Sequence, residues 1–287
     1  MTKPMSDAQP TFRFAPSPNG LLHRGHALSV LTNQWFARRC GGRLLLRIED
    51  IDPQRSRPEF ETAILRDLAW LGVAFEGEVL RQSQRMVLYR DGLDRLRERG
   101  LLYACRCSRQ EIRLAVERGE RENGRPWPRD PDAAPLYPGI CRDGNVAGSV
   151  VWRLRMDKAI AAAGPELSYL RFDETGTKTA VAADPARWGD VVLARRDVPT
   201  SYHLSVVIDD ADQAVTHVVR GRDLEAATDI HVLLQRLLGL PTPRYHFHRL
   251  LQDGEGQKLA KSRGSLSLAD LRDGGMTPGR LRAELGF

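Results

Sequence analysis

Apolar residues recur along the first hundred positions at two periods, one typical of helices and one of buried strands. The short apolar runs FRFA at 12–15 and RLLLRIE at 43–49 predict strands, and a Gly-Gly pair at 41–42 predicts the end of a helix before the second. Strand, loop, helix, strand, helix is the order of a parallel sheet with crossover helices. Spacing of three or four residues predicts three helices, carried by Leu28, Leu31 and Trp35 in 26–39, by Phe60, Ile64, Leu68 and Leu71, and by Met86, Tyr89, Leu93 and Leu96.

This rhythm breaks between about 101 and 188 and then returns. The interval holds a proline- and charge-rich stretch at 119–139 and one strand-like run, VVWRLR, at 150–155. After it, SVVID at 205–209 and VTHVVR at 215–220 predict two further buried strands. The segment 228–239 predicts a helix capped by Thr228. We therefore expect an α/β core in two halves, split by an inserted subdomain.

Composition narrows the class of protein without deciding it. The chain is 41% hydrophobic and 28% charged, and no apolar run is long enough to cross a bilayer, which argues against a membrane role. The start, MTKPMSDAQP, lacks the apolar centre of a signal peptide, so the cytoplasm is the expected location. A net charge of +6 permits a nucleic-acid partner but does not require one.

The segment RFAPSPNGLLHRGH at 13–26 combines a stiffened loop with two imidazoles. It leaves the first predicted strand and enters the first predicted helix near His26. A helix N-terminus offers free N–H groups to a phosphate, and His23 and His26 add side-chain donors. Gly25 allows the backbone to approach a ligand closely. The alternative interpretation is a Pro/Gly turn with two exposed histidines.

A second segment, QDGEGQKLAKSRGS at 252–265, carries Lys258 and Lys261 among glycines and serines. Such a loop can close over a triphosphate and neutralise the charge of departing pyrophosphate. Most loops of this kind are only solvated surface, and that alternative stays open.

Together the two segments resemble the two signatures of class I aminoacyl-tRNA synthetases, and the first resembles the glutamate-activating branch. The segments 47–56, 201–210 and 215–224 are also similar to that branch. Arg24, Asn19 and Ala260 stand where the family usually has an apolar residue, Thr or Ser, and Ser. The resemblance implies a Rossmann-like core that activates glutamate with ATP and Mg²⁺. Its catalytic residues here are His23, His26 and Lys261, and its ATP-binding residues are Gly25, Lys258 and Lys261.

An enzyme that activates glutamate must hold two carboxylates and one ammonium group, which calls for cationic forks and a buried anion. Arg13 and Arg220 end predicted strands and are candidates for the carboxylates, and Glu49 for the ammonium. Each has an alternative role in a salt bridge at the edge of the sheet. The resemblance implies that glutamate is bound by Arg13, Ala15, Ser17, Glu49, Tyr202 and Arg220.

Four cysteines in an intracellular chain of 287 residues argue against a disulfide framework. Cys40 is interpreted as a small apolar packing residue. Cys105, Cys107 and Cys141 are candidate zinc ligands, and Tyr137 is the nearest regular candidate for a fourth. Three reduced thiols and a core tyrosine are the alternative. Cys-x-Cys followed by Tyr-x3-Cys resembles the site of one structural Zn²⁺ in the glutamyl-Q tRNA(Asp) synthetases, which are truncated paralogues of glutamyl-tRNA synthetase.

Only 25 residues follow Ser262, which leaves no length for an anticodon-binding domain. The resemblance therefore implies transfer of the glutamyl group to the queuosine base in the anticodon loop of tRNA(Asp). We expect a monomer. The predicted divisions are a disordered lead-in at 1–11, core halves at 12–100 and 189–250, a zinc-containing insertion at 101–188, and the lysine loop and tail at 251–287.

Three other functions are compatible with these patterns. One is a synthetase that charges tRNA(Glu) without an anticodon domain. Another is a different carboxylate-adenylating enzyme of the nucleotidyltransferase type, against which the predicted glutamate site and the cysteines argue. The last is a non-catalytic tRNA-binding paralogue, for which intact histidines and Lys261 would have no use.

Overall fold

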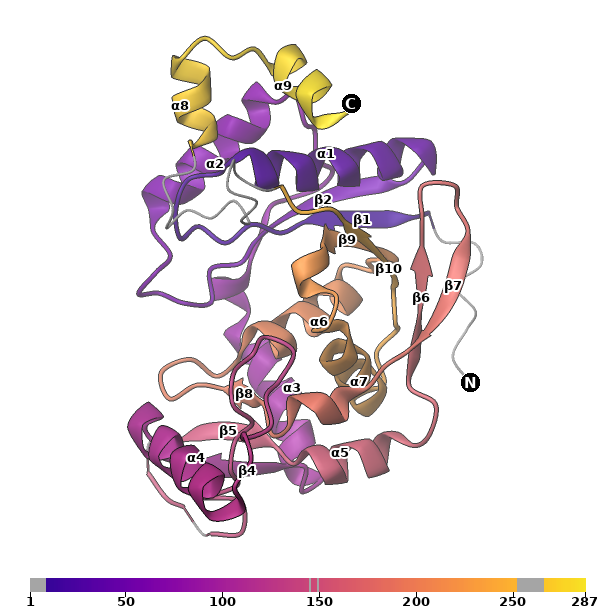
Figure 1. Cartoon of the computed structure of the whole chain (residues 1–287). Coiled ribbons are helices and arrows are strands. Elements are labelled where there is room, and N and C mark those ends of the chain that lie inside the picture. Colours follow the sequence, from indigo (N-terminus) through magenta and orange to yellow (C-terminus); the bar gives the residue numbers. More distant parts are fainter. Residues whose placement is uncertain (1–8, 145, 149, 252–265) are drawn as a thin grey trace.

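The computed structural model describes residues 9–144, 146–148, 150–251 and 266–287. Figure 1 shows two halves stacked one above the other, with the C-terminal helices at the top and the cysteine-bearing region at the bottom. In the upper half, strands β1 (Thr11–Phe14), β2 (Arg43–Ile48) and β3 (Leu80–Arg81) form a parallel sheet in that order. Helices α1 (Arg24–Arg39) and α2 (Pro58–Trp70) are the crossovers.

A second sheet continues this layer. Its order is β7-β6-β10-β9, and β9 (His217–Gly221) and β10 (Arg244–His248) run parallel. The N–H of Thr216, next to β9, donates to the carbonyl of Thr11 at 3.0 Å, which ties this sheet to β1. The hairpin β6 (Ser168–Phe172) and β7 (Lys178–Ala182) joins β10 at its outer edge, although no strand was predicted there.

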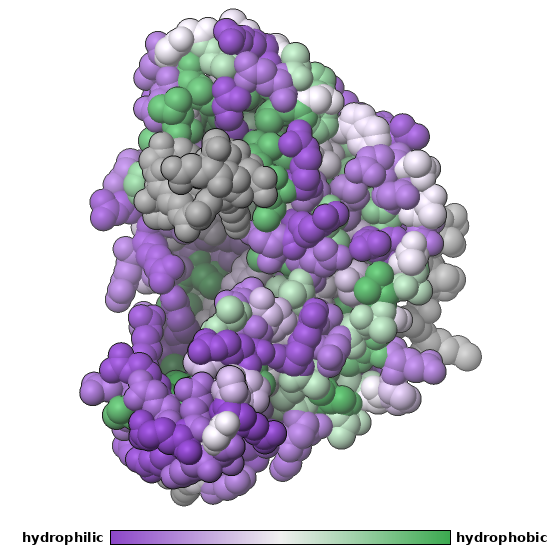
Figure 2. Space-filling view, viewed as in Figure 1, coloured by the Kyte–Doolittle hydropathy of each residue, from purple (hydrophilic) through white to green (hydrophobic). Residues whose placement is uncertain are grey.

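The lower half is built on an antiparallel sheet. Strands β4 (Leu102–Cys105), β5 (Val151–Leu154) and β8 (Val192–Ala194) pair in that order. Figure 2 shows that hydrophilic residues cover the face of this region. The helices of this half and of the C-terminus are α3 (Met86–Glu98), α4 (Arg109–Asn123), α5 (Met156–Ala163), α6 (Tyr202–Asp212), α7 (Thr228–Leu238), α8 (Leu268–Asp273) and α9 (Pro278–Leu285).

Two hydrophobic clusters hold these layers together. One packs α1, α2, α8 and α9 against β1 and β2, with Phe12 and Leu31 at its centre. The other joins α3, α6 and α7 to β9 and β10 around Leu204 and Leu233. No helix among the described residues has the length and apolarity needed to span a membrane.

Most helices and strands predicted for the first hundred residues are confirmed, and three other interpretations are wrong. The predicted strand at 205–209 lies inside helix α6, because a short apolar run alone does not distinguish a strand from a buried helix. Thr228 does not cap α7: its hydroxyl accepts a hydrogen bond from Arg220 Nη2 at 2.7 Å, and Ala227 occupies the cap position. Cys40 is exposed at the end of α1 rather than packed.

The predicted lead-in lies largely outside the described residues, since these begin at residue 9. Thr11, the last residue of that range, is the first residue of β1 and is buried.

Candidate active site

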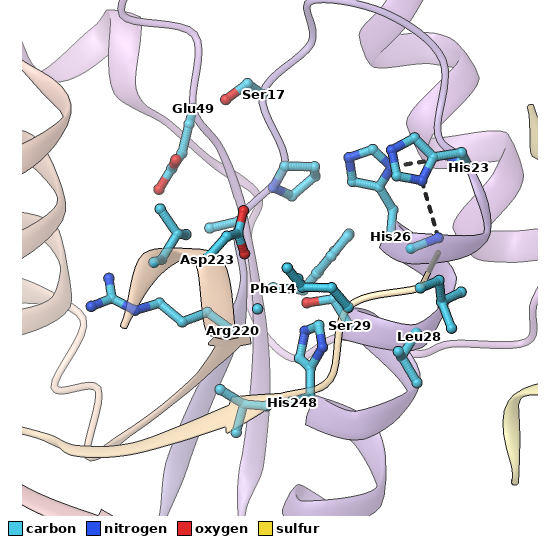
Figure 3. Close-up of a pocket in the computed structure, with 18 of the residues that line it drawn as sticks. Phe14, Ser17, His23, His26, Leu28, Ser29, Glu49, Arg220, Asp223 and His248 are labelled. Carbon is cyan, nitrogen blue, oxygen red and sulfur yellow. Dashed lines mark hydrogen bonds between the residues drawn. The ribbon is translucent and has the colours of Figure 1, made fainter. Parts of the chain in front are cut away.

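A cavity of about 850 Å³ opens where the carboxyl ends of β1, β2, β9 and β10 meet. Ligands of open α/β sheets bind at this edge. Figure 3 shows side chains from all these strands and from the start of α1 around the same space. Every described residue of the predicted glutamate and ATP sites lines the cavity: Arg13, Ala15, Ser17, His23, Gly25, His26, Glu49, Tyr202 and Arg220.

The two histidines cap helix α1 reciprocally. Nδ1 of His23 accepts the backbone N–H of Gly25 at 3.0 Å, and Nδ1 of His26 accepts the backbone N–H of His23 at 3.1 Å. A neutral imidazole that accepts through Nδ1 carries its proton on Nε2. The cap therefore makes Nε2 of each ring a donor, at the helix end where anions are favoured.

Residue 25 must be glycine because the ring of His23 lies directly against its Cα at the start of the helix. A β-carbon at residue 25 would lie 2.8 Å from Cε1 and 3.0 Å from Nδ1 of His23. Any side chain would push the ring from the position in which it caps the helix.

Arg24, which departs from the family signature, does not appear among the cavity-lining residues. Its guanidinium donates to Glu284 of α9 at 2.7 Å, on the outer side of α1. The C-terminal helix α9 therefore contacts the first residue of the helix that carries the histidines.

Lys258 and Lys261, predicted for ATP binding and catalysis, lie outside the described residues, as does Ala260. The described residues on either side of this segment lie at the cavity. Leu251 lines it, and Ser267 forms an antiparallel bridge with His23.

Arg220 lies near the end of β9 and is buried, with 5% of its surface exposed. Its Nη1 donates to Nδ1 of His231 at 3.1 Å and to the hydroxyl of Tyr202 at 3.4 Å. Its Nη2 donates to the hydroxyl of Thr228. These contacts hold the guanidinium at the floor of the cavity (Figure 3).

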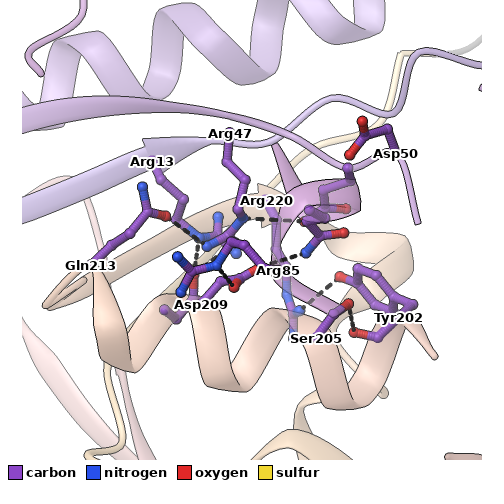
Figure 4. Close-up of polar contacts among 12 residues, drawn as sticks. Arg13, Arg47, Asp50, Arg85, Tyr202, Ser205, Asp209, Gln213 and Arg220 are labelled. Carbon is purple, nitrogen blue, oxygen red and sulfur yellow. Dashed lines mark hydrogen bonds and ion pairs between the residues drawn. The ribbon is translucent and has the colours of Figure 1, made fainter. Parts of the chain in front are cut away.

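Arg13 and Arg47 belong to a buried network of alternating charge (Figure 4), which Glu49 joins through Arg47. Asp210 of α6 accepts hydrogen bonds from Nε of Arg13 at 3.0 Å and from Nη2 of Arg47 at 2.7 Å. Nε of Arg47 lies 3.6 Å from Glu49. Burial raises the pKa of Glu49, against the opposing charges of Arg47 and Arg13, to about 7. The pKa of Asp210 is lowered: burial opposes its ionisation, but Arg13 and Arg47 outweigh it.

A family model described as the catalytic domain of class I tRNA synthetases (E and Q) matches residues 11–285. This chain belongs to that family. Membership confirms the predicted Rossmann-like class I fold with its parallel sheet, and the predicted enzyme class, an ATP-dependent ligase. Class I synthetases use ATP with Mg²⁺, so the family also implies ATP, an amino acid and tRNA as substrates.

Similar proteins indicate which branch of the family this chain resembles. Glutamyl-Q tRNA(Asp) synthetase of Rhodobacter capsulatus is 48% identical over 96% of this chain and 99% of its own length. That of Janthinobacterium sp. is 40% identical over 89% and 83%. A crystal structure of a glutamate tRNA ligase from Elizabethkingia meningosepticum in complex with its amino acid superposes with a TM-score of 0.68, at 25% identity over 93% of this chain and 53% of that one. The resemblance to glutamyl-Q tRNA(Asp) synthetases that the sequence predicted is thus confirmed.

Sequence reasoning missed four residues of the synthetase site. Asp210 holds Arg13, Arg47 lies beside Glu49 and also pairs with Asp210, and His231 holds Arg220. His248 lines the cavity and donates through Nδ1 to the carbonyl of Arg249 at 2.8 Å. Its Nε2 is then an acceptor, and it has no partner among the described residues. Arginine and aspartate inside the apolar runs RLLLRIE and SVVIDD were the available signal.

The three cysteines and Tyr137 lie together in the lower half. The sulfurs of Cys105, Cys107 and Cys141 are all within 4.8 Å of one another. The Tyr137 hydroxyl is 3.3 Å from Sγ of Cys105 and of Cys107, and Sγ of Cys107 is 3.4 Å from that of Cys141. A tetrahedral ion about 2.3 Å from each sulfur would separate them by roughly 3.8 Å, so this donor set fits a zinc ion.

The groups of the cluster differ in how readily they ionise. Burial opposes ionisation of Cys141, but hydrogen bonds from the Arg106 backbone, Tyr137 and the other cysteines lower its pKa to about 7. Burial raises the pKa of Cys107 to about 11 and also raises that of Tyr137. The guanidinium of Arg153 lies 3.8 Å from the centroid of the Tyr137 ring, where its charge favours a phenolate.

Proposed function

We propose that this synthetase activates L-glutamate with ATP and transfers the glutamyl group to the queuosine base of tRNA(Asp). Two lines of support converge. Relatives that carry this name align with most of the chain, one over 99% of its own length. Every described side chain that was predicted for glutamate or for phosphate lines one cavity.

The observation that carries the proposal is the combination of charges in that cavity. Arg220 forms no ion pair with a carboxylate among the described residues, and the largely buried acid Glu49 lines the same cavity (Figure 3). A guanidinium favours a carboxylate, and a buried carboxylate favours an ammonium. Arg220 and Arg13 are therefore assigned to the carboxylates of glutamate and Glu49 to its ammonium, with Tyr202, Ser17 and the backbone at Ala15 supplying neutral contacts.

The activation step joins the two ends of the cavity. An oxygen of the glutamate α-carboxylate attacks the α-phosphorus of ATP, the bond to the β-phosphate oxygen breaks, and pyrophosphate leaves. Nε2 of His23 and of His26 donate to the phosphate oxygens on which charge builds. Mg²⁺ bound to ATP neutralises part of that charge. Lys258 and Lys261 are proposed to neutralise the departing pyrophosphate.

The second step needs no protein nucleophile. A hydroxyl oxygen of the cyclopentene-diol ring of queuosine attacks the carbonyl carbon of glutamyl-adenylate, and AMP leaves as the ester forms. The hydroxyl proton passes to a phosphate oxygen or to solvent. Positioning and electrostatic stabilisation supply the catalysis.

We further propose one structural Zn²⁺ held by Cys105, Cys107, Cys141 and Tyr137. Four ligands leave no open coordination position, so the ion would fix the geometry of its surroundings rather than bind substrate. Cys105 ends β4, and Tyr137 and Cys141 come from the long segment between α4 and β5, so the ion would tie that segment to the sheet.

The proposal is tested by offering radiolabelled glutamate and ATP with tRNA(Asp) that carries queuosine, tRNA(Asp) without queuosine, and tRNA(Glu). We expect label on the first only. Label on tRNA(Glu) would instead favour a glutamate-charging enzyme. Glutamate-dependent ATP–pyrophosphate exchange without transfer to any tRNA would leave a carboxylate-adenylating enzyme. No exchange, with RNA binding retained, would indicate a non-catalytic paralogue.

A matched pair of variants checks that the cavity performs the chemistry. E49A and R220A should each abolish glutamate-dependent exchange, because each removes a charge that the substrate pairs with. Replacing Glu225, whose carboxylate pairs with Arg171, by Ala provides a control on the exposed rim between β9 and α7. Wild-type exchange in E49A or R220A would show that the site is misassigned. Size-exclusion chromatography tests the expected monomer.

A further inference from the structure

Arg220 differs from the other buried arginines near the cavity in the nature of its partners. Arg13 and Arg47 each form an ion pair with the buried Asp210. The partners of Arg220 among the described residues are all uncharged: two hydroxyl groups, one imidazole, and the rings of Tyr245 and Phe247 at 5.3 and 5.7 Å. The guanidinium is therefore held in place by neutral groups and forms no ion pair among the described residues.

The bond from Arg220 fixes the tautomer of His231. A guanidinium donates hydrogen bonds and never accepts them, so Nδ1 of His231 must be the acceptor of the 3.1 Å bond from Arg220. The proton of neutral His231 then lies on Nε2. That atom is 3.2 Å from Nδ1 of His203, which must accept in turn. The two rings form a chain of hydrogen bonds with one direction, from Arg220 through His231 to His203.

The surroundings keep both rings neutral. His203 lies on α6 and His231 on α7, with ring centroids 5.3 Å apart and Trp188 and Tyr202 packed edge-on against them. Burial, together with the charge of Arg220, lowers the pKa of His203 to about 4 and that of His231 well below its usual value. Neither ring adds a charge next to Arg220.

We propose that His231 is a positioning residue for glutamate binding: a neutral acceptor that orients Arg220 while leaving its charge for a substrate carboxylate. His203 accepts the Nε2 proton of His231 and so supports the tautomer that the bond from Arg220 requires. This inference rests on the proposed activation of glutamate.

The remaining donors of Arg220 support this role. A guanidinium has five N–H donors, and three of them go to His231, Tyr202 and Thr228. One hydrogen on Nη2 and the one on Nε remain, and Nε is buried with no partner among the described residues. Two donors on one guanidinium match the two oxygens of a carboxylate.

The test compares two substitutions of nearly equal shape, H231E and H231Q. Both place an oxygen acceptor against Arg220, but only Glu adds a negative charge that competes with the substrate carboxylate. We expect the KM for glutamate in H231E to exceed that in H231Q by about tenfold or more, the size of one charge-assisted hydrogen bond. The KM for ATP should be the same in both. Equal glutamate KM values in the two folded variants would overturn the proposal, since a packing role does not depend on charge.

The role of His203 has a readout that does not use activity. In protein labelled with ¹⁵N-histidine, NMR should find His231 neutral with its proton on Nε2. In H203F, which keeps an aromatic ring beside Trp188 but removes the acceptor, the Nε2 proton of His231 loses its partner, so the ¹⁵N shift of Nε2 should change and the glutamate KM should rise several-fold. A proton on Nδ1 of His231 in the wild type would contradict the proposed chain of hydrogen bonds from Arg220 through His231 to His203. Failure of the wild type to exchange pyrophosphate with glutamate would instead refute the proposed function.

Discussion

Glu49 remains difficult to ionise although Nε of Arg47 lies only 3.6 Å from its carboxylate. Arg47 is fully buried and the Glu49 side chain is only 10% exposed, and Arg47 already donates to Asp210 at 2.7 Å, so its charge is shared. Removal from water dominates, and the pKa of Glu49 is raised from an ordinary 4.5 to about 7. A buried acid that titrates near neutral pH in a binding cavity is a marker of function.

We expect kcat/KM for glutamate in pyrophosphate exchange to rise about tenfold per pH unit below pH 7 and to level off above it. The ammonium of glutamate pairs with ionised Glu49, and kcat/KM reports titration of the free enzyme, whose Glu49 has a pKa of about 7. The KM for ATP should change little, which serves as the control. A flat profile for glutamate between pH 5.5 and 8 would show that Glu49 does not bind the ammonium.

The same pKa predicts how stability changes with pH. Because the pKa of Glu49 is raised on folding from 4.5 to about 7, the native state holds the extra proton between these values. The contribution of Glu49 to the free energy of unfolding therefore falls as the pH rises through this window. In E49Q this contribution should vanish, and the difference from wild type should grow in favour of the variant up to about pH 7. Urea unfolding at pH 5 and pH 8 measures it.

Replacing Gly25 should impair catalysis while the protein still folds. In G25A the new methyl meets His23 at 2.8 Å, so the ring must leave its cap and Nε2 moves from the phosphate position. We expect the rate of glutamate-dependent exchange to fall by about 100-fold, the usual effect of one lost transition-state donor, and stability to fall by about 1 kcal/mol. G279A is the control, because a β-carbon there meets no atom within 4 Å. Near-normal exchange in G25A would exclude the proposed donor role of His23.

Asp210 joins the two halves of the core and should be costly to replace. D210N leaves Arg13 and Arg47 buried without their shared countercharge, and we expect a loss of about 3–5 kcal/mol in the free energy of unfolding. D212N, two residues on, removes a carboxylate that is 54% exposed and should cost less than about 1 kcal/mol. Chemical denaturation of both variants compares them. Similar losses would show that the buried network contributes little.

The sequence predicted the residues that line the cavity better than it predicted the residues that hold those side chains in place. The residues proposed to contact ligands occur in short contiguous segments such as 13–26, so local pattern and resemblance were enough to predict their positions. Asp210, His203 and His231 lie on helices and act through side chains that meet only in the folded chain. The misassigned strand at 205–209 hid Asp209 and Asp210, because a strand would not have placed both toward arginines of other elements.

Local reasoning also failed where a residue serves a partner far along the chain. Thr228 has the position and hydroxyl of a helix cap, yet its oxygen binds Arg220, and stabilising a buried guanidinium outweighs satisfying an N–H group at a helix end. Cys40 has the composition of a packing residue but follows the last turn of α1, where the chain is exposed. Neither outcome is encoded in the neighbouring residues.

The cysteine cluster gives the last prediction, which concerns metal content. Protein purified without chelator should contain about one zinc ion per chain, and C141S should lose it, because a serine hydroxyl is a poor replacement for a thiolate. Y137F should bind zinc about 10–100-fold more weakly but keep three sulfur ligands. C40S is the control, since Cys40 is exposed and far from the cluster along the chain. Because the proposed ion holds the segment between α4 and β5, its removal should lower the melting temperature while glutamate-dependent exchange persists below that temperature. Metal analysis that finds no zinc in the wild type, or equal zinc in wild type and C141S, would refute the assignment.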